Sequence, residues 1–166
     1  IDDDNTAATV NASTLEATEY ASSKNPASFS DLPGYSDQTF PNLESYWDKC
    51  ELDKFDGFLI LAKDKTAEFE LALASKIKST SKPFIVIRTF MDVSCQNIVD
   101  DQELDRIRND EIDHMSCNKE DVFLVSNRDT NKWDFPKVWR TILNIARETE
   151  RMNELKEQYM NDSKRY

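Results

Sequence analysis

Short apolar runs, each closed by a polar turn, alternate with amphipathic stretches over most of the chain. This alternation is typical of βαβ units, in which helical crossovers join parallel strands. All but the first of these runs are apolar almost throughout, as expected of strands that are buried on both faces of a sheet. The pattern therefore predicts an α/β fold with a doubly wound, mostly parallel sheet. The expected strands are Ala27–Ser30, Gly57–Ala62, Phe84–Arg88 and Val122–Val125.

Helices are expected between these strands and after the last one. In the stretch after the second strand, Phe69, Leu73 and Ile77 recur at i, i+4 and i+8, which places an apolar stripe on one helical face. A final helix is expected to begin after Pro136, because proline suits the first helical turn, and to be highly charged beyond Arg147. The expected helices are Leu43–Leu52, Ala67–Lys78, Val99–Asp113 and this final helix, whose apolar stripe is Val138, Ile142 and Ile145.

Composition and charge restrict the classes of partner. The 166 residues carry a net charge of −11, from 32 acidic and 21 basic side chains. A nucleic-acid partner is therefore not expected, because phosphate binding requires clustered Lys and Arg, and anionic membranes are disfavoured for the same reason. Cys50, Cys95 and Cys117 form no CxxC pair, which indicates reduced thiols. Since no apolar run reaches the length of a membrane span and the amino end has no signal-peptide pattern, a cytoplasmic protein is expected.

Polar turns follow three of the predicted strands. In a doubly wound sheet the ligand binds outside the carboxyl ends of the parallel strands, where such turns meet. The turns are therefore expected to converge on one crevice, as in a nucleotide-binding site. They are Asp31-Leu32-Pro33-Gly34, Thr89-Phe90-Met91-Asp92 and Ser126-Asn127.

Five spaced segments resemble, in the same order, the G domain of the immunity-related (interferon-inducible) GTPases, over roughly Pro26 to Arg147. The resemblance implies a P-loop GTPase-like fold that binds GTP or GDP with Mg²⁺, hydrolyses GTP slowly and self-associates through its G domain. It also implies a role in immune defence, with the protein held peripherally on intracellular membranes. The segments are Asp31–Gly34 with Phe40-Pro41, Phe55–Leu61, Phe84–Thr89, Val122–Asn127 and Asp134–Lys137.

Two departures from the family pattern bear on nucleotide binding. The chain holds only two glycines, Gly34 and Gly57, and no GxxxxGK[ST] phosphate loop. That loop supplies backbone N–H groups, a lysine and a hydroxyl to the phosphates and magnesium, so this chain alone is expected to bind GTP poorly. Phe90 stands where the guanine-reading motif usually has a lysine, which affects base affinity or selectivity.

The motif order and the first residue, Ile1, predict an N-terminally truncated G domain that lacks its phosphate-loop half. The expected organisation is a poorly ordered segment over 1–26, with loop or weak strand character, a partial G domain over 27–147 and a charged C-terminal helix extension over 148–166. A sheet without its preceding strands would leave apolar surface and a strand edge uncovered, so self-association is expected.

With this resemblance, the guanine base is assigned to Asp92 and to its neighbours in the two later turns. Asp92 would set base choice, because its carboxylate can accept hydrogen bonds from the ring imino and exocyclic amino groups that guanine presents together. Phe90 would stack on the purine and Thr89 would brace the loop. The backbone N–H groups of Ser126 and Asn127 would donate to the guanine carbonyl.

Each of these residues also has a purely structural interpretation. Asp92 suits a turn or a helix cap, and Thr89 suits a β-branched strand end. Phe90 could be a core residue that closes the pocket, and Ser126 with Asn127 could form an ordinary turn. The sequence leaves these alternatives open.

Asp31 and Gly34 would form the switch segment. Asp31 would hold Mg²⁺ through water, since Mg²⁺ keeps several waters and takes few carboxylates. Gly34 would let a backbone N–H approach the γ-phosphate without a Cβ in the way. The same turn is compatible with a plain tight turn in which Pro33 presets φ and Gly34 takes a positive φ. Tyr35, not glutamine, follows Gly34, so no catalytic residue is assigned.

Three functions are compatible with the sequence. The first is a GTP-binding domain that hydrolyses GTP slowly when a phosphate loop is present. The alternative is a nucleotide-free, degenerate G domain that acts as a protein interaction module, which Phe90 and the missing loop favour. A phosphoacceptor receiver domain is also doubly wound and acidic, but its Lys-Pro should follow a strand, whereas Lys82-Pro83 precedes one.

Overall fold

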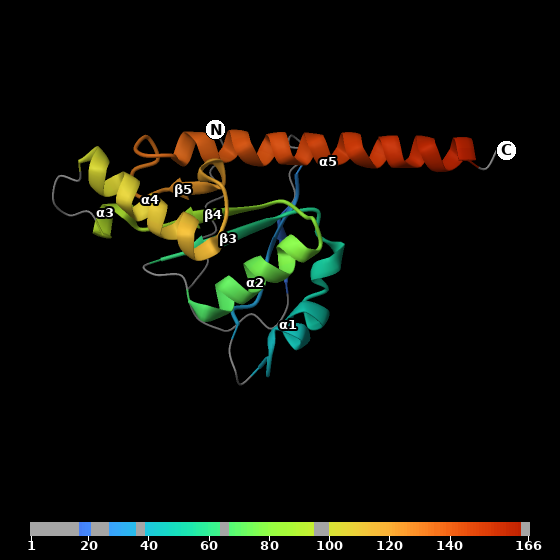
Figure 1. The fold of residues 1–166 in the computed structure, drawn as a ribbon, viewed down its shortest axis with the longest axis horizontal. Helices are drawn as coiled ribbons and strands as arrows, with labels where there is room; N and C mark the ends of the chain where they lie inside the picture. The colour runs from blue at the N-terminus through green and yellow to red at the C-terminus, as the bar shows by residue number, and fades with distance from the viewer. Residues whose placement is uncertain (1–16, 21–26, 36–38, 64–66, 95–99, 164–166) are drawn as a thin grey trace, which may run out of the picture.

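A three-stranded parallel sheet forms the centre of the fold (Figure 1). The computed structural model describes residues 17–20, 27–35, 39–63, 67–94 and 100–163. The sheet order is β3-β4-β5, and the register places Ile60 beside Val86 and Val86 beside Val122. Three of the four predicted strands are therefore confirmed, together with their parallel pairing. They are β3 (Phe58–Ala62), β4 (Phe84–Arg88) and β5 (Val122–Leu124).

The first predicted strand, Ala27–Ser30, does not join this sheet. It is observed as β2 (Phe29–Asp31), and it pairs antiparallel with β1 (Thr18–Tyr20) in a separate two-stranded sheet. The expectation of one sheet containing all four strands was wrong, because hydrophobic patterning identifies strands but does not identify their neighbours. β1 lies within the segment 1–26 that was predicted to be poorly ordered, and the rest of that segment is outside the described residues.

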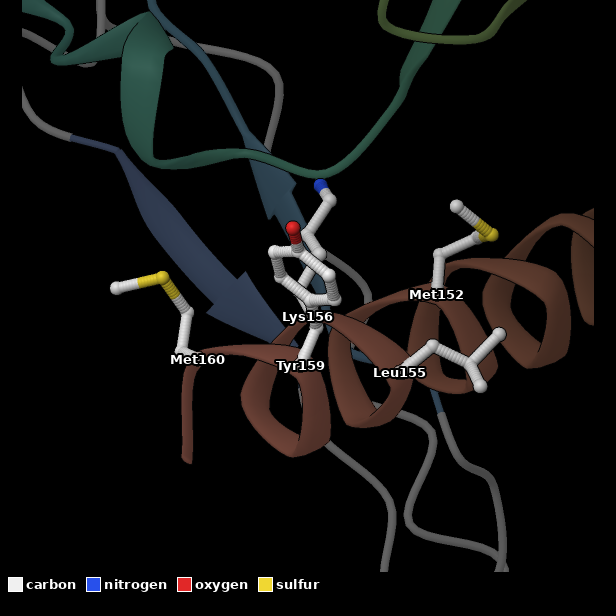
Figure 2. A pocket seen from close by; sticks show the side chains of 5 residues that line it. All are labelled: Met152, Leu155, Lys156, Tyr159 and Met160. Carbon is white, nitrogen blue, oxygen red and sulfur yellow. The ribbon is translucent and has the colours of Figure 1, made fainter. Parts of the chain in front are cut away.

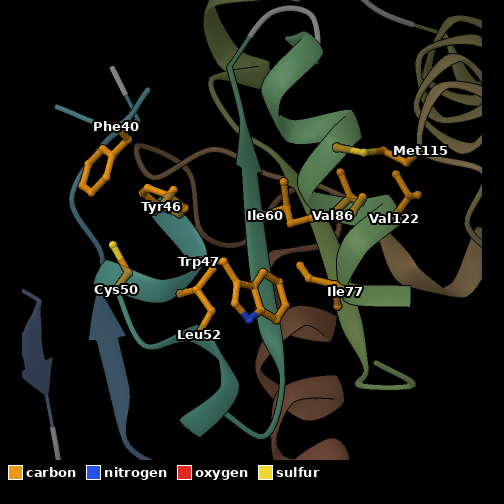
Figure 3. Close-up of a cluster of buried hydrophobic side chains, with 11 residues drawn as sticks. Phe40, Tyr46, Trp47, Cys50, Leu52, Ile60, Ile77, Val86, Met115 and Val122 are labelled. Atoms are coloured by element: carbon orange, nitrogen blue, oxygen red, sulfur yellow. The ribbon is translucent and has the colours of Figure 1, made fainter. Parts of the chain in front are cut away.

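One face of the parallel sheet is covered by three helices. Ile60, Val86 and Val122, one from each strand, are buried in one cluster with Trp47 and Ile77 (Figure 3). Two of these helices begin at side-chain caps, since Asn42 accepts from the Ser45 N–H and Asp100 from the Glu103 N–H, each at 2.9 Å. The helices are α1 (Leu43–Lys49), α2 (Glu68–Ser79) and α4 (Asp101–Met115), with 3₁₀ turns at η1 (Leu52–Lys54) and η2 (Lys119–Asp121).

The other face packs against the last helix, α5 (Phe135–Ser163). The predicted stripe Val138, Ile142 and Ile145 contacts this face, which confirms the stripe. The strand residues beneath it are Ile85, Ile87, Phe123 and Val125.

Strand β3 is only partly covered on that face. Leu59 and Leu61 pair in register with Ile85 and Ile87, so their side chains lie on the same side of the sheet. Leu59 is nevertheless 40% exposed and Leu61 62% exposed. In the part of the chain that the structure describes, β3 is also an edge strand. The sheet therefore presents an uncovered apolar edge.

Helix α5 is one continuous helix of 29 residues that extends past the sheet, so the predicted boundary at 147/148 falls inside it. Beyond Arg147 it exposes Met152, Leu155, Tyr159 and Met160 beside Lys156 (Figure 2). Over the described ranges, no helix combines the length and apolar character that crossing a membrane requires.

Candidate functional site

The loop after β4 is fixed to the end of β3. Thr89 donates twice to the Ala62 carbonyl, from its backbone N–H at 2.8 Å and from Oγ1 at 3.2 Å. Two residues later, the Met91 N–H donates to the Val125 carbonyl at 3.2 Å, and the Met91 side chain is fully buried. Thr89 thus braces the loop by hydrogen bonding, and Met91 anchors its far side.

Between these two anchors, Phe90 is held in an unusual conformation. Its φ is 59°, in the left-handed region that bulky side chains rarely adopt, at a cost of roughly 1–3 kcal/mol. The residue is 45% exposed, so it is not a core residue. The Lys63 Nζ lies 5.2 Å from the ring centroid. The hydrogen bonds on either side keep this aromatic ring at the surface where β3 and β4 end.

Asp92 joins this loop to the turn after β5. It lies in the short helix α3 (Met91–Ser94), and its Oδ1 accepts a hydrogen bond from Ser126 Oγ at 2.6 Å. Ser126 is completely buried, and its Oγ accepts from the Arg128 backbone N–H at 3.1 Å. In the Arg128 side chain, Nη1 lies 3.6 Å from Asp92 Oδ2. Asn127, which lies between Ser126 and Arg128 in the sequence, is exposed.

The expected convergence of the turns is therefore found for two of the three. Thr89, Phe90 and Asp92 share one site with Ser126 and Asn127. Lys63 and Arg128 belong to the same site, and sequence reasoning missed both. Each directly follows an apolar strand or its polar turn, and that position was the available signal.

The Asp31–Gly34 turn is the exception. Its contacts run to α1 and α2: Tyr46 Oη donates to the Pro33 carbonyl at 2.9 Å, and the adjoining Tyr35 stacks on Phe69 with centroids 3.8 Å apart. The turn follows β2, which is not in the parallel sheet, so it does not stand at the same sheet edge as the other two turns. Burial, with smaller effects from Cys50 and Asp31, raises the pKa of Tyr46 to about 12.

Gly34 does not take the positive φ that a tight turn would require. It is exposed, and a Cβ built there would meet no atom of the described residues within 4 Å. The described residues would therefore leave room for a side chain at this position.

The residues present fit a purine base better than they fit a metal ion. Asp92 Oδ1 is held by Ser126, while Oδ2 faces an exposed arginine and can accept donors from outside. Phe90 adds an exposed aromatic surface beside it. Among the described residues, no group of three or more His, Cys, Asp or Glu side chains could hold a metal. Asp31 alone cannot form a Mg²⁺ site without phosphate oxygens.

Comparison with known proteins identifies a family for the chain. The sequence model of the interferon-inducible GTPase (IIGP) family matches residues 2–161. The chain belongs to the interferon-inducible GTPase family. The description of this family names a GTPase.

Three mouse relatives illustrate the match. Interferon-gamma-inducible GTPase 10 is 30% identical over 124 residues, which cover 68% of this chain and 30% of the relative. T-cell-specific guanine nucleotide triphosphate-binding protein 2 is 29% identical over 142 residues, covering 78% of the chain and 34% of the relative. Immunity-related GTPase family M protein 1 is 30% identical over 135 residues, which cover 78% of this chain and 33% of the relative. The chain therefore spans about a third of the length of these curated relatives.

Proposed function

We propose that the chain contributes the base-binding half of a GTP-binding site in a doubly wound G domain. The observation that carries this proposal is the 2.6 Å hydrogen bond from Ser126 to Asp92, because it joins the two loops assigned to guanine. Guanine presents an imino and an amino hydrogen side by side, and Asp92 can accept from them. Phe90 would stack on the purine, and the backbone N–H groups of Ser126 and Asn127 would donate to its carbonyl oxygen.

Phosphate binding is proposed to involve the Asp31–Gly34 turn. The open space around Gly34 supports close approach of a phosphate oxygen to the backbone. Asp31 is exposed and would reach Mg²⁺ through water. The phosphate loop needed for tight binding and slow hydrolysis of GTP would come from outside these 166 residues. A cytoplasmic protein, held peripherally on intracellular membranes in immune defence, is proposed from the family alone.

The test is a comparison of GDP with ADP. We expect GDP to bind the chain about tenfold more tightly than ADP, because adenine cannot donate to Asp92 in the same way. In ¹⁵N-resolved NMR titrations, GDP should shift the amides of Thr89–Asp92 and Ser126–Arg128, and equimolar ADP should shift them much less. Equal affinities for the two nucleotides, or shifts confined to other parts of the chain, would contradict the proposal.

Self-association through the G domain is proposed on the basis of the β3 edge. Exposed strand edges with apolar side chains tend to pair with other chains, and Leu59 and Leu61 supply such side chains. Leu61→Glu is expected to shift the chain toward monomer in sedimentation-velocity runs at several concentrations. Leu155→Glu, at an exposed leucine on α5, is the matched control and should leave the distribution unchanged. An unchanged distribution for Leu61→Glu, or an equal effect of both changes, would assign association to another surface.

The β3 edge also favours the second candidate function, a nucleotide-free interaction module. In that case the β3 edge would bind a protein partner, and neither GDP nor ADP would bind at the Asp92 site. The NMR titration and the sedimentation measurement together separate the two functions.

A further inference from the structure

We propose that Arg128 competes with guanine for the Asp92 carboxylate and so sets the affinity and the base preference of the site. The inference rests on the proposed function, since it assigns Asp92 to the base. It adds a residue that lies outside the loop segments used to identify the family. Its starting point is the ion pair between Arg128 Nη1 and Asp92 Oδ2, at 3.6 Å.

The two oxygens of Asp92 have different partners. Oδ1 accepts from Ser126 Oγ, whose side chain is buried, so this contact fixes the orientation of the carboxylate. Oδ2 faces Arg128, whose side chain is 79% exposed, whereas that of Asp92 is 21% exposed. The backbone at Arg128 is tethered through its N–H to Ser126 Oγ at 3.1 Å. The guanidinium can therefore leave Oδ2 while its backbone stays in place.

The guanidinium and the guanine edge offer this carboxylate the same kind of donors. Arginine presents planar N–H groups in a fork that suits a carboxylate. Guanine presents its imino N–H and its exocyclic NH₂ on one edge, in a similar planar arrangement. Both place a planar set of donors against the open side of the Asp92 carboxylate, so the guanidinium near Oδ2 has to move aside for the guanine edge to reach it. Adenine does not present an imino N–H and an amino group together, so its binding does not require Arg128 to leave Asp92.

The exposure of the Arg128 side chain sets the size of the expected change in guanine affinity. An ion pair with one highly exposed partner stabilises by roughly 0–1 kcal/mol, which corresponds to an affinity change of about fivefold at most. If the ion pair opens quickly, only the open fraction binds the base, and the apparent association rate constant equals the intrinsic one multiplied by that fraction. The dissociation rate is not changed, because Arg128 is already displaced in the complex.

Arg128→Ala is therefore expected to tighten binding of the fluorescent probe N-methylanthraniloyl-GDP by about two- to fivefold. Stopped-flow kinetics should place this gain in the association rate constant and leave the dissociation rate constant unchanged. The affinity for N-methylanthraniloyl-ADP should not change. Raising the salt concentration should narrow the difference between wild type and Arg128→Ala, because salt screens an exposed pair.

Arg151→Ala is the matched control. It removes one exposed arginine from the second half of α5 and should leave every one of these values unchanged. Arg128→Lys keeps the charge without the planar fork, and it should bind guanine with an affinity between those of wild type and Arg128→Ala.

The outcomes separate this inference from the proposed function. If wild type prefers the guanine probe and Arg128→Ala binds it equally or more weakly, or with faster dissociation, the competition is overturned and the guanine site remains. If wild type binds both probes alike, or binds neither, the guanine site itself is overturned and the competition with it.

Discussion

Replacing Asp134 with alanine is expected to lower the free energy of unfolding by about 3 kcal/mol or more. The Asp134 carboxylate is almost completely buried, pairs with Arg108 at 2.8 Å and accepts from the Leu124 backbone N–H at 3.1 Å. It therefore joins α4 to β5 at the start of α5. Its removal leaves a partly buried guanidinium and a buried N–H without this acceptor. Urea unfolding followed by circular dichroism measures the loss.

Two further variants keep this prediction testable. Asp134→Asn preserves the shape and one acceptor, so it should lose less stability than alanine and still fold if Asp134→Ala does not. Asp105→Ala removes an exposed carboxylate that lies 3.5 Å from Lys119, and it should change stability by less than about 0.5 kcal/mol. Equal losses for Asp134→Ala and Asp105→Ala would show that burial of the first pair has no energetic consequence.

The same carboxylate predicts a dependence of stability on pH. Burial acts to raise the pKa of Asp134, but hydrogen bonds from Lys137, the Leu124 N–H and Arg108 outweigh it, and the pKa lies below its ordinary value of 3.8. A depressed folded pKa means that the ionised group stabilises the fold above about pH 4, and that this contribution is lost as the pH falls through the folded pKa. The stability difference between wild type and Asp134→Asn should therefore be full at neutral pH and shrink below about pH 4.

The parts of the fold that could be predicted are those set by local pattern. Strands β3, β4 and β5 were visible because each is a short apolar run between polar turns, and the α5 stripe was visible from its helical spacing. The pairing of β2 with β1 was not visible, because it depends on which other segment of the chain lies beside β2 in the fold. A three-residue strand such as Thr18–Tyr20 is too short to show a pattern of its own.

The candidate site was predictable to the same extent. Family resemblance and the rule for strand ends placed Asp92 near Ser126, and the hydrogen bond between them bears this out. The positive φ of Phe90 was not readable, since it results from hydrogen bonds made by its neighbours. The positions of Lys63 and Arg128 after a strand or its turn were visible in the sequence, but their partners were not, because exposed, flexible side chains acquire partners only in the folded chain.

The largest expected effect on ligand binding is that of Asp92→Asn, which should weaken GDP binding by about 100-fold. The change replaces a charged acceptor that serves two guanine donors with an amide that has one acceptor and one donor group. The amide NH₂ would then face the guanine NH₂, donor against donor. Hydrogen bonds to charged groups contribute roughly 1.5–3 kcal/mol each, so losing one and weakening another gives this magnitude.

Xanthine nucleotides provide the reciprocal measurement. Xanthine carries a carbonyl oxygen where guanine carries its amino group, so an asparagine at position 92 could donate to that oxygen and still accept from the imino N–H. Asp92→Asn should therefore bind xanthosine diphosphate more tightly than GDP, whereas wild type should show the opposite order. Asp53→Asn removes an exposed carboxylate in η1, next to the amino end of β3, and should keep the wild-type order. If Asp92→Asn melts like wild type and loses GDP binding without gaining xanthosine diphosphate binding, Asp92 does not contact the base edge.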